Sequence, residues 1–439
     1  MIQKLDEAGF VAYIVGGSVR DFLLQRPIKD HDIATNATPD EICSLFPHSI
    51  TVGKAFGVIK VPTGSAEVEV ATFREDLEYR DHRHPTGVRF SGPEEDARRR
   101  DFTINALFYD PKTSRILDPT GGIDDLKAKK LRAIGDARTR FQEDALRLLR
   151  AVRFATVLGF EIEAETAKAI HSRAKLIAHV SGERIRDELT RMLMSPQSAE
   201  AMEMLAEFKL LKQILPEVDA LRGVVQAPTS LSGAPRAKRE SDIWATTLRT
   251  LRFLQKNVGG LVAHSVPLAW AALLYDVGKP VALLKNDGKN FNGHEIEGSA
   301  LAREIGDRLR MPRADIERIA AMVEGLLKFR DVFKMREATL ERFVRLPYFD
   351  EMLELHRAQA SSSDGNLAFY EFCAFRRRQV VSSSAETPKL IDGKDLIQLG
   401  FMPGPEFSAI LRTIEDLALE RRLTTKEQAL EYVVSHFVK

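Results

Sequence analysis

The sequence predicts an α+β protein, in which a small mixed β-sheet with helices at the N-terminus is followed by an all-helical remainder. Up to Tyr109, short apolar runs alternate with stretches of helical spacing. From Arg138 onward, apolar residues recur at intervals of three and four, which is typical of amphipathic helices. A chain of 439 residues is too long for one ordinary core, so we expect about two to four domains.

The N-terminal elements follow from local signals. The glycine pair Gly16-Gly17 ends one β-rich run and precedes a helical pattern. Pro39 suits the first turn of a further helix. A turn at residues 63–65 joins two runs that we expect to pair as strands. Strands are therefore predicted over residues 10–15, 32–35, 58–61, 67–72 and 103–109, with helices over residues 19–24 and from Pro39 onward.

Two breaks interrupt the helical pattern of the C-terminal part. Residues 226–241 are rich in Pro, Ser and Gly, and residues 382–388 have a similar polar character, so both segments are expected to be linkers or exposed loops. There is no internal repeat. These changes in pattern predict four domains, over residues 1–137, 138–225, 226–380 and 381–439.

Composition excludes several classes of protein. Lys and Arg number 64 against 63 Asp and Glu, so a net charge of +1 neither requires nor excludes nucleic acid as a partner. Two cysteines, Cys43 and Cys373, exclude a disulfide scaffold and a cysteine-based zinc site, and fit a reducing cytoplasm. The sequence lacks a signal peptide and a long uncharged apolar run, so we expect a cytoplasmic protein with no membrane contact. Its oligomeric state stays open.

Asp30 and Asp32 are the first candidates for catalysis. Side chains alternate along a strand, so two aspartates separated by one residue point to the same side. The upstream pair Gly16-Gly17 can bring backbone N–H groups close to phosphates. Two carboxylates beside such a turn are expected to hold Mg²⁺, which would activate a 3′-hydroxyl and stabilise leaving pyrophosphate. The alternative is a solvated strand end with incidental acids.

Glu67 and Glu69 are candidates for a third acid at this site. Alternation places both on one face of the strand, opposite Val68 and Val70. Glu69 is our catalytic candidate. The competing interpretation is the solvent-exposed face of an edge strand.

Six segments of the chain resemble, in order, the motifs of class II tRNA nucleotidyltransferases and bacterial poly(A) polymerases. GGSVRD and DHDIAT resemble the signature of the catalytic head. EDARRRDFTINAL resembles the ribose-recognition motif, DPTGGIDDL the hinge, RFQEDALRLLRAVRF the base-selecting helix and GERIRDEL the neck motif. These segments are residues 16–21, 30–35, 95–107, 118–126, 140–154 and 182–189.

This resemblance implies a nucleotidyltransferase head over residues 1–137, a nucleobase-selecting neck, a helical body and a tRNA-binding tail. It further implies Mg²⁺-dependent addition of CCA to the 3′ end of tRNA from CTP and ATP, with A-only addition and poly(A) synthesis as alternatives. The nucleotide would be bound by Gly17, Ser18, Arg20, Asp101, Asn105, Asp144, Arg147, Arg150 and Arg153.

Several of these residues also have a direct chemical interpretation. Asp101 is able to accept a hydrogen bond from a ribose 2′-OH, the alternative being an N-cap or a loop salt bridge among the surrounding arginines. Asp144 and Arg147 are three apart on a predicted helix, so they are expected to project from one face and read the base, the alternative being a simple helix salt bridge. Arg150 and Arg153 continue as a cationic stripe for a triphosphate, or as a solvated face.

Residues 74–85 are polar and lack apolar periodicity, which predicts a mobile loop. The segment resembles the flexible loop with which this family switches from CTP to ATP. Its presence favours full CCA addition, or addition of the terminal A, over addition of the two cytidines alone.

Residues 241–295 carry a second family signature, in a degenerate form. They resemble the metal phosphohydrolase domain named for its His-Asp pair, but Thr246 and Tyr275 stand where two histidines belong. Only Asp276 and residues 293–295 fit. Imidazole is a principal ligand of transition metals, so we predict no phosphohydrolase activity.

The C-terminal part holds candidates for RNA contacts. Arg376, Arg377 and Arg378, and the basic cluster at residues 236–239, are candidate contacts to tRNA phosphates, although such charge runs are often only solvated. Residues 393–405 resemble the tail motif of the same family.

Overall fold

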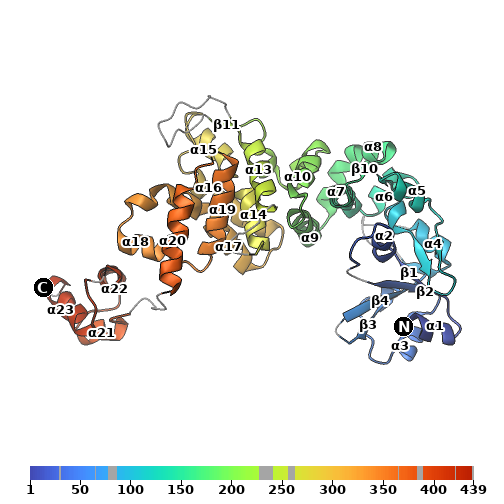
Figure 1. The fold of residues 1–439 in the computed structure, drawn as a ribbon, viewed down its shortest axis with the longest axis horizontal. Coiled ribbons are helices and arrows are strands. Elements are labelled where there is room, and N and C mark those ends of the chain that lie inside the picture. Colours follow the sequence, from blue (N-terminus) through green and yellow to red (C-terminus); the bar gives the residue numbers. More distant parts are fainter. Residues whose placement is uncertain are drawn as a thin grey trace. The chain divides into compact units, whose positions relative to one another are not determined.

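The computed structural model describes residues 1–28, 31–64, 66–77, 87–226, 241–255, 263–363, 365–382, 389–420 and 422–437. They form two compact units (Figure 1). One comprises Met1–Asp219 with Arg308–Met311, and the other comprises Ala220–Asp307 with Pro312–Lys439. The predicted division into four domains is finer than this and stays a prediction.

A six-stranded mixed sheet organises the N-terminal part of the first unit. Its strand order is β3-β4-β2-β1-β7-β8, and the predicted mixed sheet is thereby confirmed. β2 and β4 pair in parallel, whereas all other neighbours in this sheet are antiparallel. The strands are β1 (Ala12–Val15), β2 (Asp32–Thr35), β3 (Val58–Thr63), β4 (Ala66–Thr72), β7 (Phe108–Asp110) and β8 (Arg115–Leu117).

The two faces of the sheet carry separate hydrophobic cores. Alternation along β2 places Ile33 in one core and Ala34 in the other. The first core includes Leu5 from α1 (Ile2–Glu7) and Ile42 from α3 (Pro39–Leu45), so these two helices cover that face. The second includes Ala97 from α4 (Pro93–Arg98). The sheet is therefore a middle layer, buried on both sides over much of its area.

Local sequence explains where the first helices begin. Gly16 follows β1 with φ +70°, a conformation that favours glycine, and α2 (Gly17–Leu23) starts at the next residue. Pro39 occupies the first turn of α3 as expected. The Thr38 hydroxyl accepts from the Glu41 amide and the Glu41 carboxylate accepts from the Thr38 amide, which is a complete capping box.

The strand predicted over residues 103–109 is wrong in its first half. Thr103–Asn105 form a 3₁₀ turn, η2, and only Phe108–Asp110 pair as β7. The Asp101 carboxylate accepts hydrogen bonds from the Phe102 amide at 2.8 Å and the Asn105 side chain at 3.0 Å. Such local side-chain bonds compete with strand pairing and stabilise the turn instead.

The loop predicted over residues 74–85 begins as a strand. β5 (Arg74–Asp76) pairs antiparallel with β6 (Val88–Phe90). Arg89 and Glu75 face each other across the pair and form an ion pair of 2.5 Å, so charged cross-strand contacts replace the missing apolar pattern. Residues 78–86 lie outside the described part of the chain.

The rest of the first unit is helical apart from the two-residue strands β9 (Lys130–Leu131) and β10 (Glu161–Ile162). Its helices are α5 (Gly122–Lys127), α6 (Ala137–Glu143), α7 (Leu146–Leu158), α8 (Ala164–Arg173), η3 (Ala174–His179), α9 (Gly182–Leu193), α10 (Ser198–Glu207), α11 (Leu210–Ile214) and α12 (Pro216–Asp219).

The second unit is helical as expected, with one two-residue pairing between β11 (Val225–Gln226) and β12 (Ser241–Asp242). Its helices are α13 (Ile243–Gln255), α14 (Val266–Leu274), α15 (Lys279–Lys285), α16 (His294–Arg308), α17 (Arg313–Gly325), η4 (Leu326–Lys334), α18 (Glu337–Val344), α19 (Phe349–Ser362), α20 (Ala368–Ser382), α21 (Gly393–Gln398), α22 (Pro405–Leu419) and α23 (Lys426–Phe437).

One stretch in this unit, Val266–Lys285, has a mean hydropathy of 1.2 and the length of a membrane span, which the sequence analysis did not identify. Within the protein, 78% of its most apolar window is buried. Burial of this extent is typical of a core helix.

We predict that Gly122→Ala destabilises the first unit. A Cβ at this position would lie 2.3 Å from the Thr103 carbonyl oxygen, and backbone cannot move aside as a flexible side chain does. The expected loss is about 1–3 kcal/mol in the free energy of unfolding, measured by urea denaturation. Gly404→Ala is the matched control, because its nearest neighbour lies at 3.8 Å. Equal stability of Gly122→Ala and wild type would contradict the packing described.

Candidate active site

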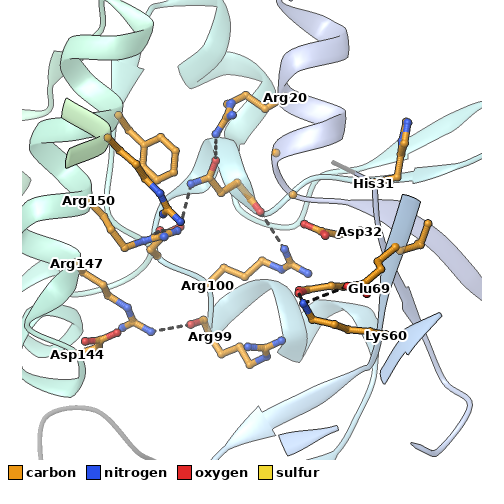
Figure 2. Close-up of a pocket in the computed structure, with 18 of the residues that line it drawn as sticks. Arg20, His31, Asp32, Lys60, Glu69, Arg99, Arg100, Asp144, Arg147 and Arg150 are labelled. Carbon is orange, nitrogen blue, oxygen red and sulfur yellow. Dashed lines mark hydrogen bonds and ion pairs between the residues drawn. The ribbon is translucent and has the colours of Figure 1, made fainter. Parts of the chain in front are cut away.

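A cavity of about 1110 Å³ opens on the face of the sheet that carries Ala34 (Figure 2). Its volume exceeds that of many small-ligand pockets, so a nucleotide and the end of a second reactant fit together. The lining residues come from β2, β3, β4, the start of α2, the segment after α4, α7 and α9. They are Gly16, Gly17, Arg20, His31, Asp32, Lys60, Thr63, Glu67, Val68, Glu69, Arg99, Arg100, Asp101, Asn105, Asp144, Arg147, Arg150, Phe154 and Arg191.

Most of the predicted site residues meet in this cavity. Gly17, Arg20, Asp32, Glu69, Asp101, Asn105, Asp144, Arg147 and Arg150 line it. Ser18 and Arg153 are not among its lining residues, and Asp30 lies outside the described residues.

Parallel pairing of β2 with β4 places Asp32 in register with Glu69. Residues in register on neighbouring strands lie on the same face of the sheet, and both side chains line the cavity. β4 lies between β3 and β2, so the interpretation of Glu69 as part of an edge strand is wrong. Glu67, two residues earlier on the same face, also lines the cavity.

The donor chemistry of this pair fits a hard divalent cation, since Mg²⁺ prefers carboxylate oxygens. Among the described residues no three His, Cys, Asp or Glu side chains group closely enough to hold a metal ion. The described part of the chain thus supplies two carboxylates, Asp32 and Glu69. The sequence prediction adds Asp30 to them.

Arginines dominate the wall opposite these acids. Arg99 and Arg100 both bind the carboxylate of Asp96, which is fully buried, at 2.8 and 3.1 Å. On α2, Arg20 donates to the Asn105 amide oxygen at 2.7 Å. Guanidinium groups are well suited to phosphate oxygens, so this wall is a candidate surface for a triphosphate.

Asp101 and Arg150 form an ion pair at the edge of the cavity, with 2.6 Å between Arg150 Nη2 and Asp101 Oδ2. Burial alone would raise the pKa of Asp101, but the Arg150 charge and the hydrogen bonds from Asn105 and Arg150 outweigh it and lower the pKa to about 2. Asp101 therefore forms a salt bridge, but with Arg150 of α7 and not with the arginines beside it in the sequence, which pair with Asp96. The Asp101 carboxylate still lines the cavity.

Asp144 and Arg147 do not project from one face of a continuous helix, and that prediction is wrong. α6 ends at Glu143, and Asp144 is extended, with φ −138° and ψ 103°. The Asp144 carboxylate accepts from the amide of Leu146, the first residue of α7, so the aspartate ends one helix and is tied to the start of the next. Both side chains nevertheless reach the same cavity.

Two residues that the sequence analysis did not single out hold this pair in place. Arg184 binds the Asp144 carboxylate with both terminal nitrogens, at 3.1 and 2.9 Å. Glu143 accepts from Arg147 at 2.8 Å, and Arg147 also donates to the Arg99 carbonyl oxygen at 3.0 Å. Both residues lie in motifs quoted above, but neither spacing nor charge indicated these contacts.

The predicted cationic stripe along α7 is only half present. Arg150 lines the cavity, whereas Arg153 binds the buried carboxylate of Glu188 on α9 at 2.6 Å. Its guanidinium also lies 4.2 Å from the centre of the Phe154 ring. A buried acid thus directs Arg153 towards α9.

The three arginines predicted to bind RNA differ in their surroundings. Arg376 forms an ion pair with Glu337, and Arg377 binds both oxygens of Asp350 at 2.9 and 2.8 Å. Arg377 also donates to the Val344 carbonyl. These contacts bind Arg376 and Arg377 to other residues of the protein, whereas Arg378 is exposed to solvent. The basic cluster at residues 236–239 lies outside the described residues.

In the segment that resembles a degenerate phosphohydrolase domain, a lysine side chain supplies a positive charge. Lys279 binds the Asp276 carboxylate at 2.8 Å and the Gln226 side chain at 2.6 Å. His294 lies 3.9 Å from Asp276, and its pKa is lowered, mainly by burial. Tyr275 contacts the Thr250 hydroxyl at 3.4 Å. Among the described residues, no group of three His, Cys, Asp or Glu side chains here could hold a metal ion, and the absence of phosphohydrolase activity stays a prediction.

We predict that the stabilising effect of the Asp101 charge is lost in acid. A carboxyl group with a pKa lowered from 3.8 to about 2 stabilises the fold above about pH 4, and this contribution disappears as the pH falls towards 2. Asp101→Asn should therefore lower the free energy of unfolding by about 2 kcal/mol near neutral pH. The difference from wild type should shrink in thermal melts between about pH 4 and pH 3. A difference that grows in acid would contradict the assignment.

Comparison with known proteins agrees with this geometry. Residues 12–132 match the family model of the poly(A) polymerase head domain, and residues 159–221 match one described as the probable RNA and SrmB-binding site of polymerase A. The CCA-adding enzyme of Lactobacillus helveticus is 30% identical over 438 residues, which cover 98% of this chain and 94% of that protein. The corresponding enzyme of Lactococcus lactis is 33% identical, with 98% and 93% covered.

Other relatives match over a shorter span or in structure. The CCA-adding enzyme of Geobacillus thermodenitrificans is 48% identical over 208 residues, and the alignment spans about half of each chain, 47% of this one and 51% of that one. The crystal structure of the Bacillus stearothermophilus CCA-adding enzyme with CTP has a TM-score of 0.73 at 28% identity, and covers 99% of this chain and 95% of its own. Nucleotidyltransferases of this type normally use divalent metals. With relatives matched over nearly its whole length, the chain belongs to the family of CCA-adding enzymes, which are tRNA nucleotidyltransferases.

Proposed function

We propose that this protein adds CCA to the 3′ end of tRNA from CTP and ATP, releasing pyrophosphate, in the cytoplasm. The observation that carries the proposal is the single cavity in which Asp32 and Glu69 lie in register on one wall, and Asp144 and Arg147 reach in from another. Acids for nucleotidyl transfer and a donor–acceptor pair for base choice are thereby combined.

Mg²⁺ is the proposed cofactor. Asp32 and the sequence-predicted Asp30 would hold it, with Glu69 as the third acid. When bound, such ions activate a 3′-hydroxyl and stabilise the leaving pyrophosphate. The protein's own contribution is to hold the tRNA end and the nucleotide in line and to neutralise the phosphates, which needs no covalent intermediate.

The nucleotide is proposed to lie between the arginine wall and α7. Arg20, Arg99 and Arg100 provide donors for the triphosphate. Asp101 and Asn105 lie at the cavity edge, where the carboxylate and the side-chain amide suit ribose hydroxyls. On the base, Asp144 would accept from an exocyclic amino group and Arg147 would donate to ring acceptors. Cytosine and adenine both carry such an amino group.

The substrates follow from relatives as well as from the site. The Bacillus stearothermophilus enzyme has been solved with CTP, and the Thermotoga maritima enzyme with a tRNA. Addition of A alone, or of a poly(A) tract, is the second candidate. The β5–β6 pair supports CCA addition, because it forms the base of the segment that resembles the nucleotide-switching loop.

The decisive assay uses three tRNA transcripts that end before CCA, after C and after CC. Each is incubated with protein, Mg²⁺ and CTP, ATP or both, and the products are separated at single-nucleotide resolution. CCA addition requires that all three transcripts reach the full 3′ end when both nucleotides are present. Growth of the CC-ended transcript alone would establish A-only addition, and long A tracts would establish a poly(A) polymerase.

Asp32→Ala and Asp30→Ala should abolish every extension and leave tRNA binding largely intact, because these carboxylates are assigned to the metal and not to RNA. Single-turnover extension and filter binding on the same preparations check both parts. Near-normal turnover in either variant would refute its metal role.

Asp144→Ala and Arg147→Ala should lose discrimination against UTP and GTP by about 5- to 100-fold, because each removes one partner of the base. The ratio of kcat/KM for CTP and UTP on the tRNA transcript measures this effect. Arg138→Ala is the matched control, since Arg138 is exposed and does not line the cavity. Unchanged discrimination in the Asp144 and Arg147 variants would contradict the assigned role.

A further inference from the structure

Three charged side chains form one row across the sheet. Lys60 on β3 is in register with Glu69 on β4, and Glu69 is in register with Asp32 on β2. All three line the cavity, and Figure 2 shows Lys60 directed towards Glu69. Ile59 and Val61, the neighbours of Lys60 along β3, are buried in the core on the opposite face. The strand therefore holds Lys60 on the cavity side.

The Lys60 ammonium bridges two acids of the cavity. Its Nζ atom lies 3.5 Å from Glu69 Oε1 and 3.7 Å from Glu67 Oε2. The Lys60 side chain is 37% exposed, and those of Glu67 and Glu69 are about half exposed. Ion pairs open to water are weak, so another cation is able to displace this ammonium from Glu69.

Lys60 differs from the other cations of the cavity in its position. Among the described lining residues, it is the one cation on the wall formed by β3 and β4. Arg99, Arg100 and Arg150 pair with Asp96 or Asp101 on the opposite wall. Lys60 is instead paired with an acid that is proposed to serve the metal.

We propose that Lys60 competes with the divalent ion for Glu69 and so sets the metal concentration that the enzyme requires. This proposal rests on the metal role assigned to Asp32 and Glu69 under the proposed function. Glu69 lies between β3 and β2, with the Lys60 ammonium on one side and the Asp32 carboxylate on the other. Without the metal, Lys60 neutralises Glu69. When the metal ion is bound, the nearby Lys60 ammonium repels it.

A direct phosphate contact is the competing role for Lys60. A lysine ammonium is a compact charge that often binds phosphate. Here the ammonium is already shared between Glu67 and Glu69. With two carboxylates beside it, the Lys60 ammonium is better placed to compete with a metal ion for Glu69 than to attract a phosphate.

The test measures Mn²⁺ binding to the nucleotide-free full-length protein by electron paramagnetic resonance, with Mn²⁺ as the probe for Mg²⁺. Lys60→Met should lower the Mn²⁺ dissociation constant by about three- to tenfold at low salt, with a smaller effect at high salt. The Mg²⁺ concentration for half-maximal extension should fall in parallel. Lys60→Arg keeps the charge and should restore wild-type binding.

Lys54→Met is the matched control, because Lys54 pairs with Asp40 away from this cavity and its loss changes the net charge equally. An effect of Lys54→Met as large as that of Lys60→Met would overturn the proposal in favour of a general charge effect. Unchanged Mn²⁺ binding in Lys60→Met, with a raised KM for nucleotide or tRNA, would overturn it in favour of a phosphate contact. If neither wild type nor any variant bound Mn²⁺, the metal assignment would fall, and the Lys60 proposal with it.

Discussion

The parallel pairing of β2 with β4 is the constraint on which the site depends. It places Asp32 beside Glu69 on the cavity face, while Ile33 and Val70, the next pair in register, face the opposite hydrophobic core. A shift of one residue would turn Glu69 into that core and expose Val70. Burial of the apolar pair therefore fixes the position of the acidic pair. The wall that carries these two acids is as rigid as the sheet itself, which suits a reaction that depends on alignment.

The opposite wall depends on buried carboxylates. Asp96, Asp101 and Glu188 are almost fully buried, and each binds at least one arginine at or near the cavity. A buried carboxylate is costly unless it is paired, so each acid restrains the arginine that neutralises it. Under the proposed function, such a wall would be preorganised for phosphate charge and would not need to reorganise when a substrate arrives. Because the acids neutralise part of the positive charge, seven lysine and arginine side chains are able to lie together around the cavity.

The pair proposed to choose the base lies at a break between helices. Asp144 lies between α6 and α7, where it is held by Arg184, while Glu143 at the end of α6 holds Arg147. Movement of α6 against α7 would shift the acceptor and the donor relative to each other. Under the proposed function, such movement would allow one pair of side chains to suit both cytosine and adenine, as a population shift within one site and without a second pocket.

Much of this protein was decided by local sequence. Alternation along residues 58–61 and 67–72 was enough to predict paired strands with Glu67 and Glu69 on one face, and Pro39 marked the start of a helix. Motif resemblance identified eight of the residues that line the cavity, and alternation along residues 67–72 added Glu69. The sequence could not predict the ion-pair partners of these side chains, because an ion pair depends on which distant elements of the chain meet. Arg153 is directed away from the cavity by Glu188, Asp101 is held by Arg150, and Lys60 meets Glu69 only because β3 and β4 pair in register. Local propensity determines where a strand or helix begins, whereas burial of apolar faces determines which elements come together, and only that second step decides which charges become neighbours.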